Sequence, residues 1–456
     1  MNKIRLVVHD YKRFSKHNTP PTFDFNCINM HIERLQENFT EEKRQNWTQG
    51  NKIQLHRLIN SSKIELVSRE QMFSLEDSIR EIPTFYLVTI PDIGGMFDTG
   101  WIKWLPSDVK NFLRSSGIPI LLSQPGEFGF EWIDVKHDHS WISNIVTYFL
   151  SKLTQENIHN PVIIHNMSKT YLNLNFKNRS CDSVYSRQWI EHVKMTDNLN
   201  SQPINFDQHI QNIENKRVFF SSNRAPREAR CLFLLELLKR DNLQFGHISF
   251  LCEAPATVKL SREEVKQFFD SMYFYSKGKI DESEFITYRN KALDMLPLEL
   301  DSNILERNNH VILNNNINQY RLNSIFEVVI ETHDFTRESV FAGVLSEKVF
   351  WPILNQMPFI IIGHRNNVQL LHDLGFKTFE EEFGIEQDQP SIYSQINNAN
   401  LTISKFSHMQ KLEIKKWLES DQVKNKILYN YNHLINTDWN KNEVENLISV
   451  FNKLMF

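Results

Sequence analysis

The sequence predicts an α/β protein built from two doubly wound domains that face each other across a cleft. Short apolar runs rich in β-branched residues recur along the chain with helical patterns between them, which is typical of parallel strands joined by crossover helices. The chain has 456 residues, which is too long for one core of ordinary size. No repeat of fixed period is present, which argues against solenoids and propellers.

The composition is that of a globular enzyme. Apolar residues make up 41% of the chain and charged residues 23%, with 13 Gly and 15 Pro, which argues against fibrous and disordered classes. The net charge of -4 provides no general attraction to a phosphate backbone. The four cysteines form no C-x-x-C pair, so neither a disulfide framework nor a zinc cluster is indicated.

The chain shows no targeting or membrane-spanning pattern. The first ten residues, MNKIRLVVHD, are a charged start followed by a short strand pattern, unlike the three regions of a signal peptide. The longest apolar runs, such as residues 231–235 and 357–362, are far shorter than a bilayer span. We therefore expect a soluble, cytoplasmic protein with no membrane span.

The first half of the chain is expected to form one Rossmann-like domain, residues 1–205. A polar stretch of helical character covers residues 32–80, and an Asn-rich polar stretch at 180–215 suits a domain boundary. Four apolar runs that end in polar residues, Gly or Pro are the predicted strands: residues 4–9, 85–90, 118–123 and 162–165.

The second half is expected to form a similar domain, residues 206–456. It carries a helical insertion at 261–296 and a helical tail at 412–456. The predicted strands are residues 217–221, 247–250, 326–330 and 359–362, and the predicted helices between them include 226–239 and 368–374. Ligands of doubly wound sheets bind outside the carboxyl ends of the strands, so the loops after these strands are where chemistry is expected.

One such loop, residues 221–230, connects the first strand of the second half to a helix. Asn223 is a candidate N-cap, and Pro226 suits a first helical turn, where its missing N–H leaves no bond unmade. Arg224, Arg227 and Arg230 would then lie in the first turn, where the helix dipole disfavours cations.

These arginines predict a bound anion. A diphosphate fits, because backbone N–H groups and guanidinium groups can converge on the same oxygens. The alternative is that the arginines pair with nearby carboxylates such as Glu228 on a solvated surface.

A second loop follows the strand at residues 326–330. Glu331 comes directly after this strand, and Ser346-Glu347-Lys348 opens another helical segment. Ser346 can cap the helix, Glu347 can accept hydrogen bonds from two ribose hydroxyls, and Lys348 can neutralise phosphate charge. The alternative for Glu347 and Lys348 is an ordinary exposed ion pair at a helix start.

The order Glu331, Ser346-Glu347-Lys348, Pro358 and Gly363 resembles the donor-binding half of α-1,3-type fucosyltransferases and of phage-encoded proteins with a similar C-terminal domain. Those enzymes carry a Phe-Glu-Asn strand end, a Thr-Glu-Lys helix start and a Pro-strand-Gly unit. The resemblance covers residues 217–379.

The resemblance also implies a phosphate-binding arginine early in the first helix of this domain. Arg230 matches it best, and Arg227 is the competitor. The chain departs from the pattern at Thr332 and Val344 and has a longer loop before Glu347, which leaves the nucleotide and the sugar open. The implied architecture is GT-B, with the donor in the C-terminal half and the acceptor in the N-terminal half.

Glycosyl transfer requires that the leaving diphosphate be neutralised, either by a divalent ion on an Asp-x-Asp motif or by fixed cations and helix dipoles. The sequence contains no Asp-x-Asp motif. We therefore expect Arg230 and Lys348 to perform this task with no essential metal or cofactor.

The acceptor hydroxyl needs a general base, and the candidates lie in the N-terminal half. Residues 97–101 and 124–129 follow predicted strands and combine turns, aromatics and a carboxylate. Glu127 is the preferred catalytic base and Asp98 the second choice. The alternative is that both are solvated acids in turns.

The leading hypothesis is therefore a metal-independent glycosyltransferase whose donor site contains Arg227, Arg230, Glu331, Ser346, Glu347 and Lys348. Its partners would be a nucleotide-diphosphate sugar and an acceptor that is a glycan, a lipid-linked precursor or a hydroxylated DNA base. Two alternatives stay open. One is a non-catalytic nucleotide- or glycan-binding protein, and the other is a nucleic-acid-binding protein that places Arg224, Arg227 and Arg230 on phosphates.

Overall fold

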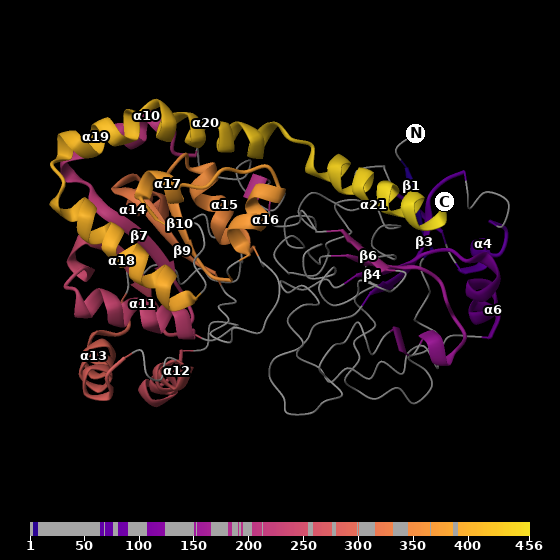
Figure 1. The fold of residues 1–456 in the computed structure, drawn as a ribbon, viewed down its shortest axis with the longest axis horizontal. Coiled ribbons are helices and arrows are strands. Elements are labelled where there is room, and N and C mark those ends of the chain that lie inside the picture. Colours follow the sequence, from indigo (N-terminus) through magenta and orange to yellow (C-terminus); the bar gives the residue numbers. More distant parts are fainter. Residues whose placement is uncertain are drawn as a thin grey trace. The chain divides into compact units, whose positions relative to one another are not determined.

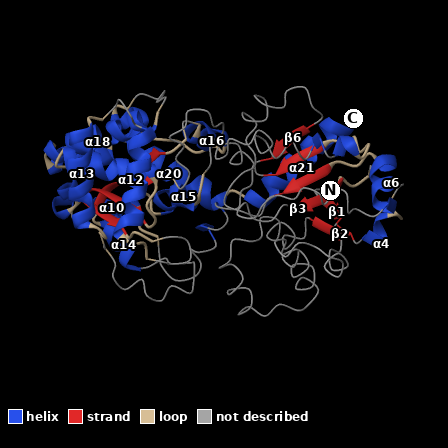
Figure 2. Ribbon diagram, turned by 90° about the horizontal axis from the view of Figure 1, so that it is seen from below, coloured by secondary structure: helices blue, strands red, loops and turns tan. Residues whose placement is uncertain are grey.

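The computed structural model describes residues 3–7, 64–67, 69–75, 81–89, 107–123, 150–151, 153–165, 181–184, 190, 193–194, 203–211, 213–253, 259–275, 280–298, 300, 315–331, 345–364, 366–385 and 391–456. The chain divides into two compact units. The first comprises Met1–Gln188, Val340–Ala342 and Asp438–Phe456, and the second comprises Trp189–Ser339 and Gly343–Thr437. Each unit contains a parallel β-sheet with helices around it, so the chain is an α/β protein (Figures 1 and 2).

The first unit is built on a six-stranded sheet in the order β2-β1-β3-β4-β5-β6. Every neighbouring pair is parallel. The strands are β1 (Ile4–Val7), β2 (Ile64–Val67), β3 (Thr84–Thr89), β4 (Ile120–Ser123), β5 (Val162–His165) and β6 (Cys181–Val184). Helices α4 (Arg69–Met72) and α6 (Ser107–Ser116) lie between them along the chain, and residues 150–151 and 153–155 are also helical.

The four strands predicted for this half are present, and two further strands were missed. Strand β2 lies inside the stretch 32–80, for which a helical character was predicted, and that interpretation is wrong for residues 64–67. Strand β6 lies inside the polar stretch that was interpreted as a connection. Both strands are only four residues long, and both sit at the sheet edges, where one neighbour is enough to define a strand.

The last helix of the chain, α21 (Trp439–Met455), packs on the sheet of the first unit. Its apolar face joins a core cluster that includes Ile4, Phe85 and Phe451. The rings of Phe85 and Phe451 meet edge to face, with centroids 5.4 Å apart. Figure 2 shows α21 lying along the strands. The end of the chain is therefore part of the first core.

The second unit is built on a four-stranded parallel sheet in the order β10-β9-β7-β8. Its strands are β7 (Arg217–Asn223), β8 (Gly246–Phe250), β9 (Ser324–Ile330) and β10 (Phe359–Ile362). All four predicted strands are confirmed. Both sheets begin with the strand order second, first, third, fourth, so each reverses direction beside its first strand.

Helices cover both faces of the second sheet (Figure 1). Helices α11 and α18 pack together on one face, and α15 and α20 pack together on the other. The helices of this unit are α10 (Phe206–Ile210), α11 (Glu228–Lys239), α12 (Arg262–Tyr275), α13 (Glu282–Met295), α14 (Asn315–Leu322), α15 (Glu347–Leu354), α16 (Asn367–Asp373), α17 (Glu380–Phe383), α18 (Ile392–His408), α19 (Lys411–Glu419) and α20 (Asp421–Asn436). Short 3-10 turns are found at Ile213–Asn215 and Leu243–Phe245.

Helix α11 is buried on all sides. Ten consecutive residues from Ala229 onward are buried. Helices α12 and α13, which form the predicted insertion, pack against it, and α18 flanks it. A helix enclosed in this way needs apolar residues on every side. The insertion therefore forms an outer layer over α11.

The predicted domains were residues 1–205 and 206–456. The compact units place the boundary between Gln188 and Trp189 and assign Asp438–Phe456 to the first unit. The physical reason for the second difference is the packing of α21 on the first sheet, which a helical pattern alone does not reveal.

Candidate functional site

The candidate site lies at the carboxyl ends of β7 and β9. These two strands are neighbours, and the chain leaves them in opposite directions, β7 toward β8 and β9 toward β10. With right-handed crossovers the following helices, α11 and α15, cover opposite faces of the sheet. Both helices begin at the end of the sheet where β7 and β9 have their carboxyl ends. This is the position at which doubly wound sheets bind ligands.

The turn from β7 into α11 leaves the start of that helix without a side-chain cap. Strand β7 continues to Asn223, so the prediction that Asn223 caps the helix is wrong. The N-cap is Arg227, whose side chain makes no capping hydrogen bond. The first N–H groups of α11 therefore have no partner from the capping side chain, and such groups attract anions.

Arg230 is buried at the same carboxyl end of the sheet, with 3% of its surface exposed. Its Nη1 donates to the carbonyl of Ala225 at 2.8 Å, and its Nη2 lies 3.5 Å from the carbonyl oxygen of Ile330. The guanidinium group therefore joins the turn after β7 to the last residue of β9. A buried guanidinium creates a strong positive potential around it.

The other two arginines differ from Arg230. Arg224 lies 3.3 Å from the buried carboxylate of Glu253, which follows β8. The Nε atom of Arg227 is buried, and none of the described residues supplies an acceptor for it. Glu228 accepts a hydrogen bond from Ser271 at 3.4 Å. The expected alternative, pairing with carboxylates, thus holds for Arg224, with Glu253 as the partner.

A second buried group without a partner is the side-chain carbonyl of Asn223. Its Nδ2 donates to Ser221 at 3.1 Å, while Oδ1 is buried with no donor from the described part of the chain. Unpaired buried polar atoms are uncommon in native structures. The unpaired Oδ1 of Asn223 and Nε of Arg227 flank the turn between β7 and α11. They are groups that a polar ligand would satisfy.

Across the switch point, Glu331 holds the start of α15. It is 1% exposed, and Oε1 accepts from the backbone N–H of Ser346 at 3.1 Å while Oε2 accepts from the Ser346 hydroxyl at 2.5 Å. Burial raises the pKa of the Glu331 carboxyl, and the Lys348 ammonium and the hydrogen bonds from Ser346 oppose that rise. With both oxygens engaged by Ser346, Glu331 acts on the site through Ser346.

Ser346 in turn positions Lys348. Its hydroxyl oxygen caps α15 by accepting from the backbone N–H of Lys348 at 3.3 Å, and it lies 3.4 Å from the Lys348 Nζ. The Lys348 Nζ also lies 3.3 Å from Oε1 of Glu347. Helix α15 begins at Glu347 as predicted and continues through Pro352.

Gly363, at the end of β10, allows Glu331 to occupy its place. A Cβ atom at position 363 would lie 2.6 Å from Nδ2 of Asn367 and 3.1 Å from Cβ of Glu331. A side chain here would therefore require neighbours to move. The backbone N–H of Gly363 donates to Gln395 at 2.9 Å, which ties the end of β10 to α18.

The structure thus brings Arg230, Glu331, Ser346 and Lys348 to one end of β9. Arg230 contacts Ile330, and Glu331 is the next residue along the chain. Arg227 lies at the start of α11 and Glu347 at the start of α15. The candidate bases Glu127 and Asp98 lie outside the described residues. Asn223 was predicted only as a helix cap, and Gln395 was not predicted, because no local pattern marks it.

Within the described ranges, no three His, Cys, Asp or Glu side chains come together in a group that could hold a metal ion. Among the described helices, none combines the length and the apolar character needed to cross a bilayer.

Comparisons with protein-family models and with curated proteins found no match to this chain.

Proposed function

We propose that the chain is a glycosyltransferase of the GT-B type, which moves a sugar from a nucleotide-diphosphate donor to an acceptor hydroxyl. The observation that supports this proposal is that Arg230 contacts Ile330, the last residue of β9, while Lys348 is linked through Ser346 to Glu331, the next residue along the chain. The start of α11, which has no side-chain cap, follows the neighbouring strand β7. Two cations and the start of a helix that lacks a side-chain cap suit a diphosphate.

The chemical task follows from this charge. In glycosyl transfer the acceptor oxygen forms a bond to the anomeric carbon, the bond from that carbon to the diphosphate oxygen breaks, and the acceptor proton passes to a base. Negative charge builds up on the departing diphosphate. Arg230, Lys348 and the N–H groups of α11 would stabilise this charge, and Arg227 adds a guanidinium at the helix start.

Lys348 must exchange its present contacts for phosphate oxygens. Its Nζ now rests between the Ser346 hydroxyl and the Glu347 carboxylate, at 3.4 and 3.3 Å. A phosphate carries more charge than a hydroxyl and would compete well for the ammonium group. The released Glu347 carboxylate could then accept hydrogen bonds from ribose hydroxyls.

The acceptor would bind on the first unit, with Glu127 or Asp98 as the general base. The proposal assigns neutralisation of the leaving group to side chains and needs no metal ion or cofactor. A glycan, a lipid-linked precursor and a hydroxylated DNA base are all acceptors of the required chemistry.

The two alternatives make different demands on the same residues. A nucleic-acid-binding protein would present its arginines to a surface ligand, but Arg230 is buried and Arg224 is paired with Glu253. A binding protein without catalysis would use the same cationic site and differ only in turnover. Incubation of the protein with its best-bound donor, glycans and duplex DNA distinguishes the enzyme from the non-catalytic binding protein, because only the enzyme produces a transferred sugar.

The proposal is tested by a thermal-shift panel of UDP, GDP, CDP, ADP and their sugars with wild type, Lys348→Ala and a control. A ligand at about 100 times its Kd stabilises the folded state by about 2.7 kcal/mol, which raises the Tm by roughly 5–10 °C. We expect one nucleotide to do so in wild type and to lose most of this effect in Lys348→Ala.

The matched control is Lys416→Ala, because Lys416 is an exposed lysine of α19 in the same unit. It should behave as wild type. Equal shifts in wild type and Lys348→Ala, or no shift with any nucleotide, would contradict the proposal.

A further inference from the structure

Asn223, the last residue of β7, carries a buried oxygen that finds no donor among the described residues. The residue is 1% exposed, and the unpaired atom is Oδ1. The Ser221 hydroxyl fixes the assignment of this amide. Because it donates its proton to the carbonyl of Val328 at 2.9 Å, it can only accept from Asn223, so the group that faces it at 3.1 Å is Nδ2. Oδ1 therefore points away from Ser221 and needs a donor.

The side chain of Asn223 lies on the face of the sheet that α11 covers. The ring of Phe219, four residues earlier, meets the ring of Phe233 on α11 with centroids 6.1 Å apart. Alternate residues of a strand share one face, so Ser221 and Asn223 follow Phe219 on this side. The chain then turns through residues 224–227 directly into α11. The unpaired oxygen therefore lies beside the first turn of that helix.

Arg227, the N-cap of α11, has the opposite need. Its Nε is buried and lacks an acceptor within the described ranges, and a guanidinium N–H suits a phosphate oxygen. Oδ1 of Asn223 can only accept, so it suits an O–H or N–H group. The oxygens of a sugar-bearing diphosphate are ionised at neutral pH and have no proton to donate. A diphosphate can therefore satisfy Arg227 but not Asn223, which requires a donor group next to the anion.

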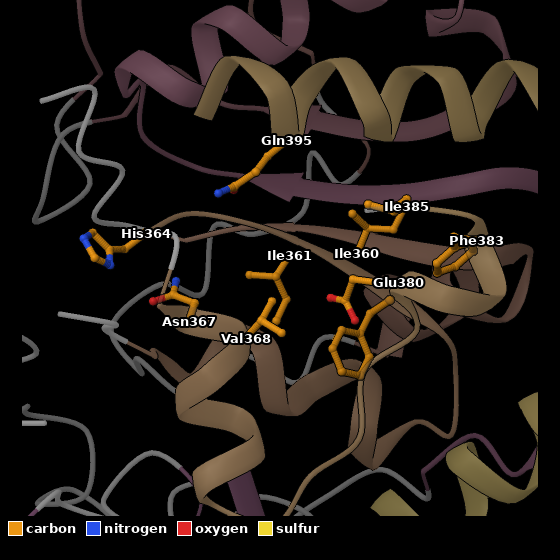
Figure 3. A pocket seen from close by; sticks show the side chains of 10 residues that line it. Ile360, Ile361, His364, Asn367, Val368, Glu380, Phe383, Ile385 and Gln395 are labelled. Carbon is orange, nitrogen blue, oxygen red and sulfur yellow. The ribbon is translucent and has the colours of Figure 1, made fainter. Parts of the chain in front are cut away.

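The pocket along β10 differs from this turn, from which β9 separates it. Figure 3 shows the side chains of Gln395, His364 and Asn367 toward one end of that pocket. Oε1 of Gln395 accepts from the backbone N–H of Gly363 at 2.9 Å, and Nδ1 of His364 accepts from that of Asn366 at 3.2 Å. These contacts fix the backbone after β10, whereas the end of β7 keeps an acceptor that no described residue pairs.

The two faces of the sheet separate the two ends of the donor. Under the proposed function the diphosphate lies at the carboxyl ends of β7 and β9, and Glu347 accepts hydrogen bonds from the ribose. Glu347 begins α15, which covers the face opposite to α11. With the ribose on the α15 face, the group on the other phosphate lies on the α11 face, beside Asn223. That group is the transferred sugar.

We infer that Oδ1 of Asn223 accepts a hydrogen bond from a hydroxyl of the transferred sugar, which makes Asn223 a residue that determines specificity for the donor. This inference rests on the proposed function, because it assumes that the diphosphate binds beside Arg230 and Lys348. A sugar hydroxyl completes the hydrogen bonding of the buried amide, whereas a nucleoside diphosphate without its sugar leaves Oδ1 unpaired.

Calorimetric titration with matched ligands tests the contact. The pairs are UDP and UDP-glucose, GDP and GDP-mannose, CDP and CDP-glucose, and ADP and ADP-glucose. In the pair that binds, Asn223→Leu should weaken the sugar nucleotide at least about tenfold more than it weakens the nucleoside diphosphate. Equal losses would place the contact on the nucleotide, and no loss with either ligand would show that Asn223 contacts neither. Both results would overturn the inference.

The stability of the same variant provides a test that needs no ligand. Leucine is close to asparagine in size, and Asn223→Leu gives up the hydrogen bond to Ser221 together with an oxygen that has no described partner. These two effects oppose each other, so the Tm should stay within about 2 °C of wild type.

The matched control is Asn430→Leu. Asn430 is also 1% exposed, but its Oδ1 accepts from the backbone N–H of Lys377 at 2.8 Å and its Nδ2 donates to the carbonyl of Lys377 at 2.7 Å. Its Tm should therefore fall by roughly 4 °C or more. An equal fall in Asn223→Leu would show that Oδ1 of Asn223 has a partner within the fold, and the inference would be wrong.

The two proposals fail in different ways. If wild type binds no nucleoside diphosphate, the proposed function and this inference both fail. If binding depends on Lys348 but Asn223→Leu affects the nucleoside diphosphate and the sugar nucleotide alike, only the inference fails.

Discussion

Among single residues, the candidate site depends on the buried carboxylate of Glu331, whose two oxygens both accept hydrogen bonds from Ser346. These two hydrogen bonds come from the backbone N–H and from the hydroxyl of Ser346. The Ser346 hydroxyl oxygen in turn accepts hydrogen bonds from the backbone N–H and the ammonium group of Lys348. The sequence predicted Glu331 as one of the donor-site residues, and its contacts with Ser346 make it a positioning residue.

Glu331→Gln tests this role through the pH dependence of stability. Because burial raises the pKa of Glu331 above its usual 4.5, the wild-type group adds a stability that is present at low pH and is lost as the pH rises through the raised value. The variant lacks this dependence. Its free energy of unfolding relative to wild type should therefore increase between pH 4.5 and pH 7, by up to about 1.4 kcal/mol per pH unit.

Urea denaturation at these two pH values measures the difference. If the wild type instead gains stability relative to the variant as the pH rises, the surroundings of Glu331 favour its ionised form and lower its pKa, which would contradict the prediction.

The sequence predicted the residues that act through local patterns and missed those that act through distant contacts. Ser346 and Lys348 were found because a cap and a cation at a helix start are visible in the sequence. Gln395 was missed because its partner, Gly363, lies 32 residues away. Asn223 was misassigned as a cap because nothing local shows that β7 continues to that position.

Among the helices and strands, α15 contributes most to the candidate site, because its first turn carries Glu347 and Lys348. Ser346→Ala removes both the cap of α15 and the hydroxyl donor to buried Glu331. We expect a loss of roughly 2–4 kcal/mol in the free energy of unfolding, as the sum of a missing cap and a buried acceptor deprived of its donor. Chemical denaturation provides the measurement.

Ser420→Ala is the matched control. Ser420 caps α20 by accepting from Val423 and has no buried carboxylate partner, so its loss should be about 1 kcal/mol. If the two serine variants lose the same stability, the contact between Ser346 and Glu331 contributes nothing.

Long helices and strands can be predicted from the periodicity of the sequence more easily than short ones. The four strands of the second unit and helices such as α11 were predicted, because seven buried residues in β9 or the twelve residues of α11 form a clear pattern. Helix α18 was not predicted. Four-residue strands such as β2 and β6 give no such pattern, and their pairing partners decide their structure.

At the scale of the whole molecule, the chain consists of two units with separate sheets, and its end belongs to the first. Helix α21 is anchored by a hydrogen bond of 2.8 Å between His165 and Glu443, both fully buried. Lys453 adds an ion pair of 2.7 Å with Asp182 on β6. Patterns in the sequence predicted the helix but not the sheet on which it packs.

Glu443→Ala tests this anchoring. It leaves His165 without that partner inside the core and creates a cavity, so the first unit should lose about 2–4 kcal/mol of stability. Calorimetry should show the transition of the first unit moved to lower temperature and that of the second unchanged.

The control on the same helix is Glu445→Ala. The Glu445 side chain is 43% exposed and pairs with Lys441 at 3.8 Å, so its loss should change stability by less than about 0.5 kcal/mol. A downward shift of both transitions in Glu443→Ala would contradict the assignment of α21 to the first unit.

We propose that Lys348 and the arginines at the switch point of the second sheet bind a diphosphate. A crystal structure of the protein with its best-bound nucleoside diphosphate tests this directly. We expect phosphate oxygens within hydrogen-bonding distance of the Lys348 Nζ and of the first N–H groups of α11, with Arg227 or Arg230 on the same group. A nucleotide bound elsewhere, with Lys348 still resting on Glu347 and Ser346, would contradict it.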